Sequence, residues 1–251
     1  MAAPPKLCSL ILGLLLLALG GTAASASDDE LCNHAGADPD AGIPACTRLL
    51  EHPNPGINVP AAYNQRGVAE VRKGDLDSAV ADFTSALNQN PNFVDALKNR
   101  GITRHMEGDS DAAIADFNQA LLLDAMAPDL YNARGSAFID KGEYDRAIAD
   151  FDKAISLDPN YKKAYVNRGL AFHYERRPDR AIADFDVFVR LAPNEPIGYL
   201  DRAAARMDKA DFKGAVADYN EAIRLDPTNS DVYTRRGEAW RLQGELGRSQ
   251  A

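Results

Sequence analysis

Apolar positions along most of this chain recur at helical spacing, in pairs of blocks that repeat with a fixed period. Five stretches, starting at residues 79, 113, 147, 181 and 215, have the sequences AVADFTSAL, AIADFNQAL, AIADFDKAI, AIADFDVFV and AVADYNEAI, so each begins 34 residues after the last. A second apolar block precedes each stretch, and a turn such as Lys141-Gly142-Glu143 separates the two blocks. The pattern predicts repeated units of two helices joined by a short turn.

Small and aromatic residues at fixed places in each unit indicate how the two helices pack. In the third unit, Gly135 in the first helix and Ala147 and Ala154 in the second permit close approach, and Phe151 fills the space beside them. An Asp-Pro or Asn-Pro pair ends the second helix in most units, because proline lacks the backbone donor and disfavours helix before it. A single hairpin cannot bury its apolar face, so we expect the units to stack around one continuous core.

The unit resembles the tetratricopeptide repeat, and the resemblance covers residues 60–251. In the third unit the matching positions are Tyr131, Gly135, Phe138, Gly142, Ala147, Phe151, Ala154 and Pro159. The resemblance implies an all-α fold, a right-handed solenoid of helix-turn-helix hairpins. The expected repeats are 60–93, 94–127, 128–161, 162–195 and 196–229, with a partial unit at 230–251.

An arginine and an aspartate also recur once per unit. The arginines of the first helices are Arg66, Arg100, Arg134, Arg168, Arg202 and Arg236; the aspartates of the second helices are Asp82, Asp116, Asp150, Asp184 and Asp218. A catalytic residue would occur once, whereas a residue present in every unit serves the repeat. We therefore predict a ladder of ion pairs between helices, and we predict that the chain is not an enzyme and needs no cofactor. One position varies: Glu70, Arg104 and Arg206 stand where the third unit has Phe138.

The resemblance implies that a peptide segment of another protein binds along a concave groove formed by the first helices. The candidate groove residues are Asn64, Lys98, Asn99, His105, Asn132, Lys163, Asn167, His173, Tyr174 and Asp201. Asn99, Asn132 and Asn167 are the central candidates, because an amide both donates to and accepts from a peptide backbone. Lys98, Lys163 and Asn167 match part of the carboxylate-binding set of chaperone adaptors, but Ile102 and Ala133 break that set, so we do not predict that specificity.

The first residues have the layout of a secretory signal peptide. Lys6 precedes an apolar stretch from Leu7 to Leu19, and Ala24-Ser25-Ala26 supplies a cleavage site. The stretch is short for a membrane span, which needs about 20 residues, although an uncleaved anchor is the alternative. We expect residues 1–26 to be removed, and the mature chain to be periplasmic or secreted without stable membrane insertion.

Residues 27–59 differ from the repeats and contain the two cysteines of the mature chain, Cys32 and Cys46. A cysteine pair in an exported protein indicates a disulfide. His34 and His52 lie close by, so a metal site, and with it a metal-handling or enzyme-accessory role, is the alternative. We expect an N-terminal cap in which residues 43–51 form a helix, with Cys46 in the place of the repeat aromatic and the disulfide holding an extended arm. The segment resembles the start of small exported proteobacterial proteins.

The net charge argues against one class of partner, and the last unit adds a second candidate surface for a protein partner. The formal net charge is −9, and this argues against nucleic acid as a partner, since a phosphate-binding surface needs clustered lysines and arginines. The partial sixth unit offers one helix with Trp240, whose exposed side chain would be a second candidate surface for a protein partner.

Overall fold

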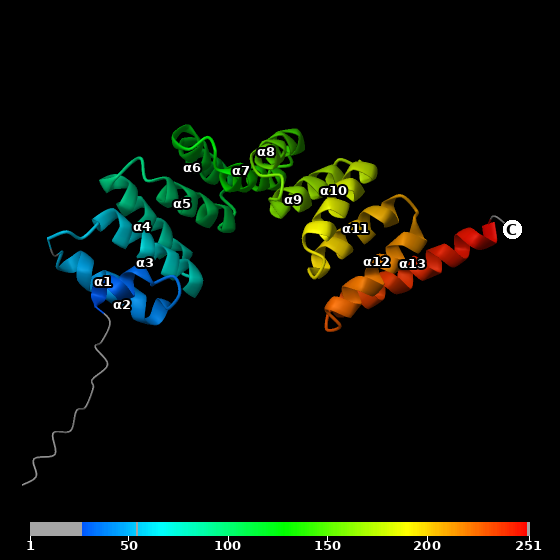
Figure 1. Ribbon diagram of the computed structural model, residues 1–251, viewed down its shortest axis with the longest axis horizontal. Helices are drawn as coiled ribbons and strands as arrows, with labels where there is room; N and C mark the ends of the chain where they lie inside the picture. Colours follow the sequence, from blue (N-terminus) through cyan, green and yellow to red (C-terminus); the bar gives the residue numbers. More distant parts are fainter. Residues whose placement is uncertain (1–26, 54, 250–251) are drawn as a thin grey trace, which may run out of the picture.

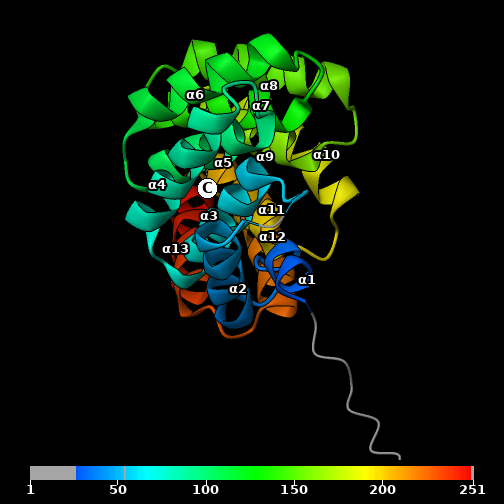
Figure 2. The ribbon, with the colours of Figure 1, turned by 90° about the vertical axis from the view of Figure 1, so that its left-hand side faces the viewer.

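The computed structural model describes residues 27–53 and 55–249, and within these residues the chain forms thirteen helices and no strand. The predicted signal peptide at 1–26 lies outside the described residues. None of the described helices is long and apolar enough to cross a membrane. Successive helices pack side by side, and Figure 1 shows them as an arch with α6 and α8 on its outer side. Figure 2 shows the same stack from the end that carries α1 and α2.

Five two-helix units make up the body of the arch, as the period predicts. The helices are α3 (Val59–Lys73) with α4 (Leu76–Gln89), α5 (Val94–Met106) with α6 (Ser110–Leu123), α7 (Pro128–Asp140) with α8 (Tyr144–Leu157), α9 (Lys162–Tyr174) with α10 (Pro178–Leu191), and α11 (Pro196–Asp208) with α12 (Phe212–Leu225). We call α3, α5, α7, α9 and α11 the A helices and their partners the B helices. Helix α13 (Ser230–Ser249) is a further A helix that packs on α12.

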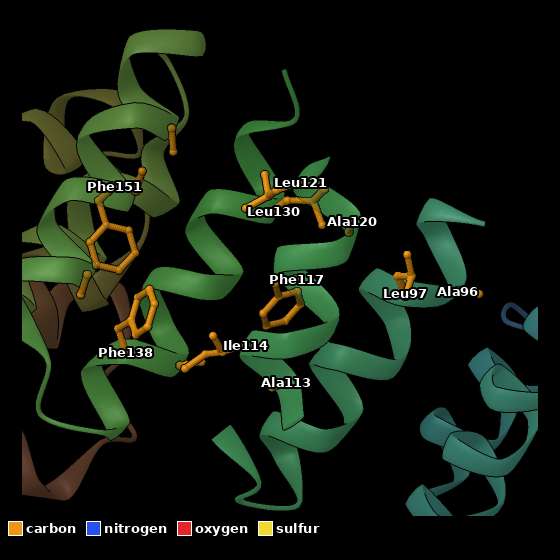
Figure 3. Packing of buried hydrophobic residues seen from close by; sticks show 14 of the residues in the cluster. Ala96, Leu97, Ala113, Ile114, Phe117, Ala120, Leu121, Leu130, Phe138 and Phe151 are labelled. Carbon is orange, nitrogen blue, oxygen red and sulfur yellow. The ribbon is translucent and has the colours of Figure 1, made fainter. Parts of the chain in front are cut away.

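Aromatic rings pack against glycines in the middle of the hairpins. Phe83, Phe117, Phe151 and Phe185 are fully buried, and each lies over the glycine 16 residues earlier in its A helix. A Cβ atom added to Gly135 would lie 2.6 Å from the Phe151 ring, so no larger residue fits there without movement. One core cluster is continuous from α4 to α9, and Figure 3 shows Phe117, Phe138 and Phe151 inside it.

The turn between the two helices of a unit needs a left-handed residue. Gly74, Gly108 and Gly142 occupy this position with φ of 83°, 87° and 71°. In the fourth and fifth units the same position holds Arg176 and Ala210, each with φ of 57°, where a side chain is unfavourable. Pro178 is the first residue of α10, where a missing backbone donor is harmless.

The cap contains two helices, α1 (Asp28–Asn33) and α2 (Pro39–Glu51), and two expectations for it were wrong. The segment held by the disulfide is a short helix and not an extended arm, since Ser27 accepts from the Glu30 amide and begins α1. The second helix starts at Pro39 and not at residue 43, because Asp38 accepts from the Ala41 amide and caps it. Helix α2 nevertheless behaves as a B helix, because its Thr47 accepts from Arg66 as Thr84 does from Arg100.

Candidate functional site

The recurrent arginines and aspartates form the predicted ladder of ion pairs. In each of the five units the arginine of the A helix donates through Nε and Nη2 to both oxygens of the buried aspartate of the B helix, as Arg134 does to Asp150 at 2.8 and 2.7 Å. The third nitrogen, Nη1, reaches back to the preceding B helix, where it binds Asn118 Oδ1 at 2.7 Å in the case of Arg134. Each arginine therefore joins its own hairpin to the neighbouring unit, and a bidentate, shielded pair of this kind fixes geometry. The ladder is structural.

At the variable position beside the ladder, the structure shows why two of the units have an arginine. Arg104 and Arg206 each donate a further hydrogen bond of 2.8 Å, to Asp116 and Asp218. In the first unit the position holds Glu70, whose Oε2 is buried and has no hydrogen-bond partner within the described residues. Burial first, and then the negative charge of Asp82, raise the pKa of the Glu70 carboxyl to about 7. The first unit thus places two carboxyl groups where the second and fifth units place an arginine and an aspartate.

The predicted groove asparagines lie on the A helices, but they are joined in pairs. Asn99 Nδ2 donates to Asn64 Oδ1 at 3.0 Å, and Asn167 Nδ2 donates to Asn132 Oδ1 at 2.9 Å. Each bond connects the A helices of neighbouring units. The amides therefore also link the repeats, a role that the sequence analysis missed; the 35-residue spacing of each pair is the signal that could have revealed it.

Most of the charged groove candidates also bridge neighbouring A helices. Lys98 Nζ lies 3.1 Å from Asp129 Oδ2, and His105 Nε2 lies 2.5 Å from Asp140 Oδ2. His173 Nδ1 lies 3.1 Å from Asp208 Oδ2 without hydrogen-bond alignment.

Two candidates remain open to a ligand. Lys163 is exposed and forms no ion pair in the described part of the chain. Tyr174 is 51% exposed, and its ring stacks on Tyr144 with centroids 5.6 Å apart. These side chains can contact a partner without first breaking a salt bridge.

The surface that the A helices form together, which we call the A-helix surface, also contains an apolar hollow that was not expected from the sequence. It lies between α3 and α5, has a volume of about 160 Å³, and is lined by Val68, Val71, Arg72, Phe83, Asn99, Ile102 and Thr103. Ile102, which breaks the carboxylate-binding set, is part of this wall and is exposed. The hollow places apolar surface beside the first asparagine pair.

Asp201, the last groove candidate, differs from the others. Its Oδ2 is buried without a hydrogen-bond partner in the described ranges, and Asp201 forms no ion pair there. Burial alone raises the pKa of the Asp201 carboxyl to about 6, so the group is still mostly ionised at neutral pH.

The cysteine segment is closed by a disulfide. Cys32 and Cys46 are bonded to each other, with their Cα atoms 4.7 Å apart. Zinc binds cysteine as a thiolate, and a disulfide offers none. His34 Nδ1 lies 2.8 Å from the backbone oxygen of Glu30, and within residues 27–53 and 55–249 no group of three or more His, Cys, Asp or Glu side chains is arranged to hold a metal ion.

At the C-terminal end, Trp240 is 51% exposed on α13, and the Arg236 guanidinium lies 4.6 Å from the centre of its ring. Arg236 is the ladder arginine of the sixth unit, and its Nε has no hydrogen-bond partner within the described residues. Trp240 is thus an accessible aromatic surface, as expected from the sequence.

Several solved structures resemble this arrangement. MamA is 26% identical, with 66% of this chain and 96% of that chain covered and a TM-score of 0.59. A tetratricopeptide repeat protein from Parabacteroides merdae is 22% identical, with 88% of each chain covered and a TM-score of 0.71. YrrB, described as a TPR protein with an unusual peptide-binding site, is 17% identical, with 76% of this chain and 96% of that chain covered and a TM-score of 0.58. The last two likenesses show the fold alone.

Family profiles agree with the fold. A profile described as TPR repeat matches residues 135–174 and 203–244, and one described as Tetratricopeptide repeat matches residues 64–130. No curated protein matches the chain significantly. The matched segments together cover more than half of the sequence and repeat the period of its helices, and the chain belongs to the tetratricopeptide repeat family.

Proposed function

We propose that this protein is a non-catalytic scaffold that holds a peptide segment of a partner protein along its A-helix surface. Tetratricopeptide repeat proteins are in general protein-interaction scaffolds, and YrrB is described as having a peptide-binding site. The observation that carries the proposal is the composition of this surface. It combines hydrogen-bonding amides at Asn99, Asn132 and Asn167 with an apolar hollow and the exposed side chains of Lys163 and Tyr174.

The paired amides can still serve a ligand. A primary amide offers two donors and two acceptor sites, and the bond within each pair uses only one of them on each residue; Asn167 Nδ2 in addition donates to Ser136 Oγ at 3.3 Å. A peptide backbone would take the remaining donors and acceptors, at about 1 kcal/mol per hydrogen bond. Replacing all three asparagines by alanine would then weaken binding by about one to two orders of magnitude. The same change also removes the bonds between repeats, so a fall in melting temperature accompanies it.

Exposed side chains that do not link the repeats by hydrogen bonds therefore give the cleaner test. A random peptide library displayed on phage would be selected against the folded chain, and the affinities of the selected peptides measured by calorimetry. We expect Lys163→Glu and Tyr174→Ala to weaken binding at least about tenfold. Lys153→Glu is the matched control for Lys163→Glu, because Lys153 is exposed on the B helix α8 and its replacement changes the charge by the same amount. If Trp240→Ala abolishes binding while the two groove variants bind as the parent does, α13 is the interface.

We also propose that the chain is exported and works in a periplasm or outside the cell. The apolar stretch 7–19, the Ala24-Ser25-Ala26 site and the Cys32–Cys46 disulfide support this. N-terminal sequencing of the protein from a secreting host is the test. A mature chain that starts near Ser27 agrees with export, and one that starts at Met1 contradicts cleavage.

A further inference from the structure

Amide bonds join α3 to α5 and α7 to α9, and in α11 the position of the donor asparagine holds a carboxylate, Asp201. In α5 and α9, Asn99 and Asn167 donate to an asparagine 35 residues earlier. Asp201 is the residue 34 positions after Asn167, and the residue 35 positions before Asp201 is Val166. A carboxylate cannot donate a hydrogen bond and a valine side chain cannot accept one. Asp201 therefore takes no part in the linkage that its position serves in α5 and α9.

Asp201 lines a cavity of about 210 Å³ between α11 and α13. Ile197, Leu200, Ala204 and Val232 give the cavity apolar walls, and Asn229, Asp231 and Arg235 complete its lining. Ile197 is 46% exposed although it is large and apolar. In the second, third and fourth units this position is occupied by the polar residues Asp95, Asp129 and Lys163. The cavity thus combines exposed apolar surface with a single unpartnered carboxylate.

Four other carboxylates of the A helices have a basic side chain close by. Asp129 forms an ion pair with Lys98 and Asp231 with Arg235, while Asp140 lies 2.5 Å from His105 Nε2 and Asp208 lies 3.1 Å from His173 Nδ1. Arg235 lines the same cavity as Asp201, but its Nε donates to Asp231 Oδ2 at 2.6 Å. A partly buried carboxylate without a counter-charge is costly, so a cation supplied from outside would be bound favourably.

We propose that this cavity binds a lysine side chain of the peptide that occupies the A-helix surface, with the ammonium group on Asp201 and the methylene groups along Ile197 and Leu200. The inference rests on the proposed function and adds the chemistry of one partner residue. Lysine fits better than arginine, because the buried Oδ2 leaves one carboxylate oxygen for the ligand, and the planar fork of arginine gains its bidentate advantage only where both oxygens are available. The long apolar stem of lysine also matches the walls of the cavity.

The test uses the same peptide library with the whole mature chain and with Asp201→Asn. We expect peptides selected on the parent chain to share a lysine at one position, and peptides selected on the variant to lack it. For one parent-selected peptide, Asp201→Asn should weaken binding at least about tenfold, and so should replacement of the peptide lysine by norleucine. The two changes together should cost no more than either alone, because both remove the same contact.

Two further variants make the test specific. Asp179→Asn is the matched control, because Asp179 is an exposed aspartate on α10 that pairs with Lys209, away from the cavity; it should leave the affinity unchanged. Arg235→Gln should keep or raise the affinity, because Arg235 is the one cation of the cavity lining that could compete for Asp201.

The outcomes separate this inference from the proposed function. A library that yields no binder contradicts the proposed function and this inference with it. Binders without a shared lysine, or binders that tolerate both Asp201→Asn and norleucine, overturn the lysine site alone. A loss of affinity with Arg235→Gln would assign the contact to Arg235 and would also overturn it. The norleucine peptide needs no protein variant, so the test stands even if Asp201→Asn folds poorly.

Discussion

Glu70 offers a direct test of how the ladder stabilises each unit. It occupies the position from which Arg104 and Arg206 donate to the buried ladder aspartate, yet it adds a second carboxyl group beside Asp82. Replacing Glu70 by arginine should supply the missing donor, and replacing it by glutamine should remove the charge while keeping the shape. We expect both variants to be more stable than the parent near pH 8.

The size of the effect follows from the pKa of Glu70. A rise from 4.5 to about 7 on folding corresponds to at most about 3 kcal/mol of destabilisation once the group is ionised. Because the side chain is partly exposed, solvent screening reduces this to about 1–2 kcal/mol. The arginine introduced by Glu70→Arg would add a charged hydrogen bond of the kind that Arg104 makes with Asp116, so this variant should exceed Glu70→Gln in stability by about 1 kcal/mol.

The pH dependence gives the sharper result. In the folded chain the raised pKa means that Glu70 holds its proton to higher pH than in the unfolded chain, so its cost is absent below about pH 4.5 and grows as the pH rises to about 7. The advantage of Glu70→Gln over the parent should therefore be small near pH 4.5 and complete near pH 8. Urea unfolding followed by circular dichroism at both pH values measures it.

The reciprocal change is the control for this position. Arg104→Glu should place a carboxyl group beside Asp116 and reproduce the defect, with a loss of about 2 kcal/mol near pH 8. An equal gain from Glu70→Gln at both pH values would refute the pKa argument. No gain from Glu70→Arg at either pH would refute the role assigned to the position.

Three further predictions concern the cap, the turns and the cores. Reduction of Cys32–Cys46 should cost about 3 kcal/mol within the cap and leave most of the helical circular dichroism, because stability in a solenoid is local; loss of most of that signal would contradict a separate cap. Ala210→Gly should stabilise the fifth unit by about 1 kcal/mol and Gly142→Ala should destabilise the third unit, since both turn residues have positive φ. Thermal unfolding measures both changes. If the two variants shift the melting temperature in the same direction, backbone strain is not the cause. Gly135→Ala should lower the stability by about 1–3 kcal/mol because the new Cβ meets the Phe151 ring. Gly237→Ala, whose Cβ meets no other atom, should stabilise the helix slightly. Thermal unfolding of both variants shows whether contact with the ring decides if the substitution stabilises or destabilises.

The sequence predicts the repeats well, because their period and small-residue pattern are local and occur five times. Gly135, Phe151 and the Arg134–Asp150 pair illustrate this: each has a role that follows from its place in the unit. The cap is harder to predict, since its two helices occur once and their starts depend on capping by Ser27 and Asp38.

The candidate site is predictable only in outline. The A helices do carry the predicted residues, but the pairing of Asn64 with Asn99 and of Lys98 with Asp129 depends on the distance between neighbouring units. The isolation of Asp201 likewise follows from Val166, a residue with no evident link to it in the sequence. Contacts between units therefore decide which polar side chains are left for a ligand.

The central claim is that the A-helix surface holds a peptide, and photo-crosslinking tests it most directly. A photoreactive phenylalanine derivative would replace Tyr174 on the A helix α9 or, as the control, Lys153 on the B helix α8; both side chains are exposed. A library-selected peptide would be added to each variant and irradiated, and the products analysed by mass spectrometry. We expect the peptide to be captured from position 174 and not from position 153. Capture from position 153 alone would contradict a binding surface on the A helices.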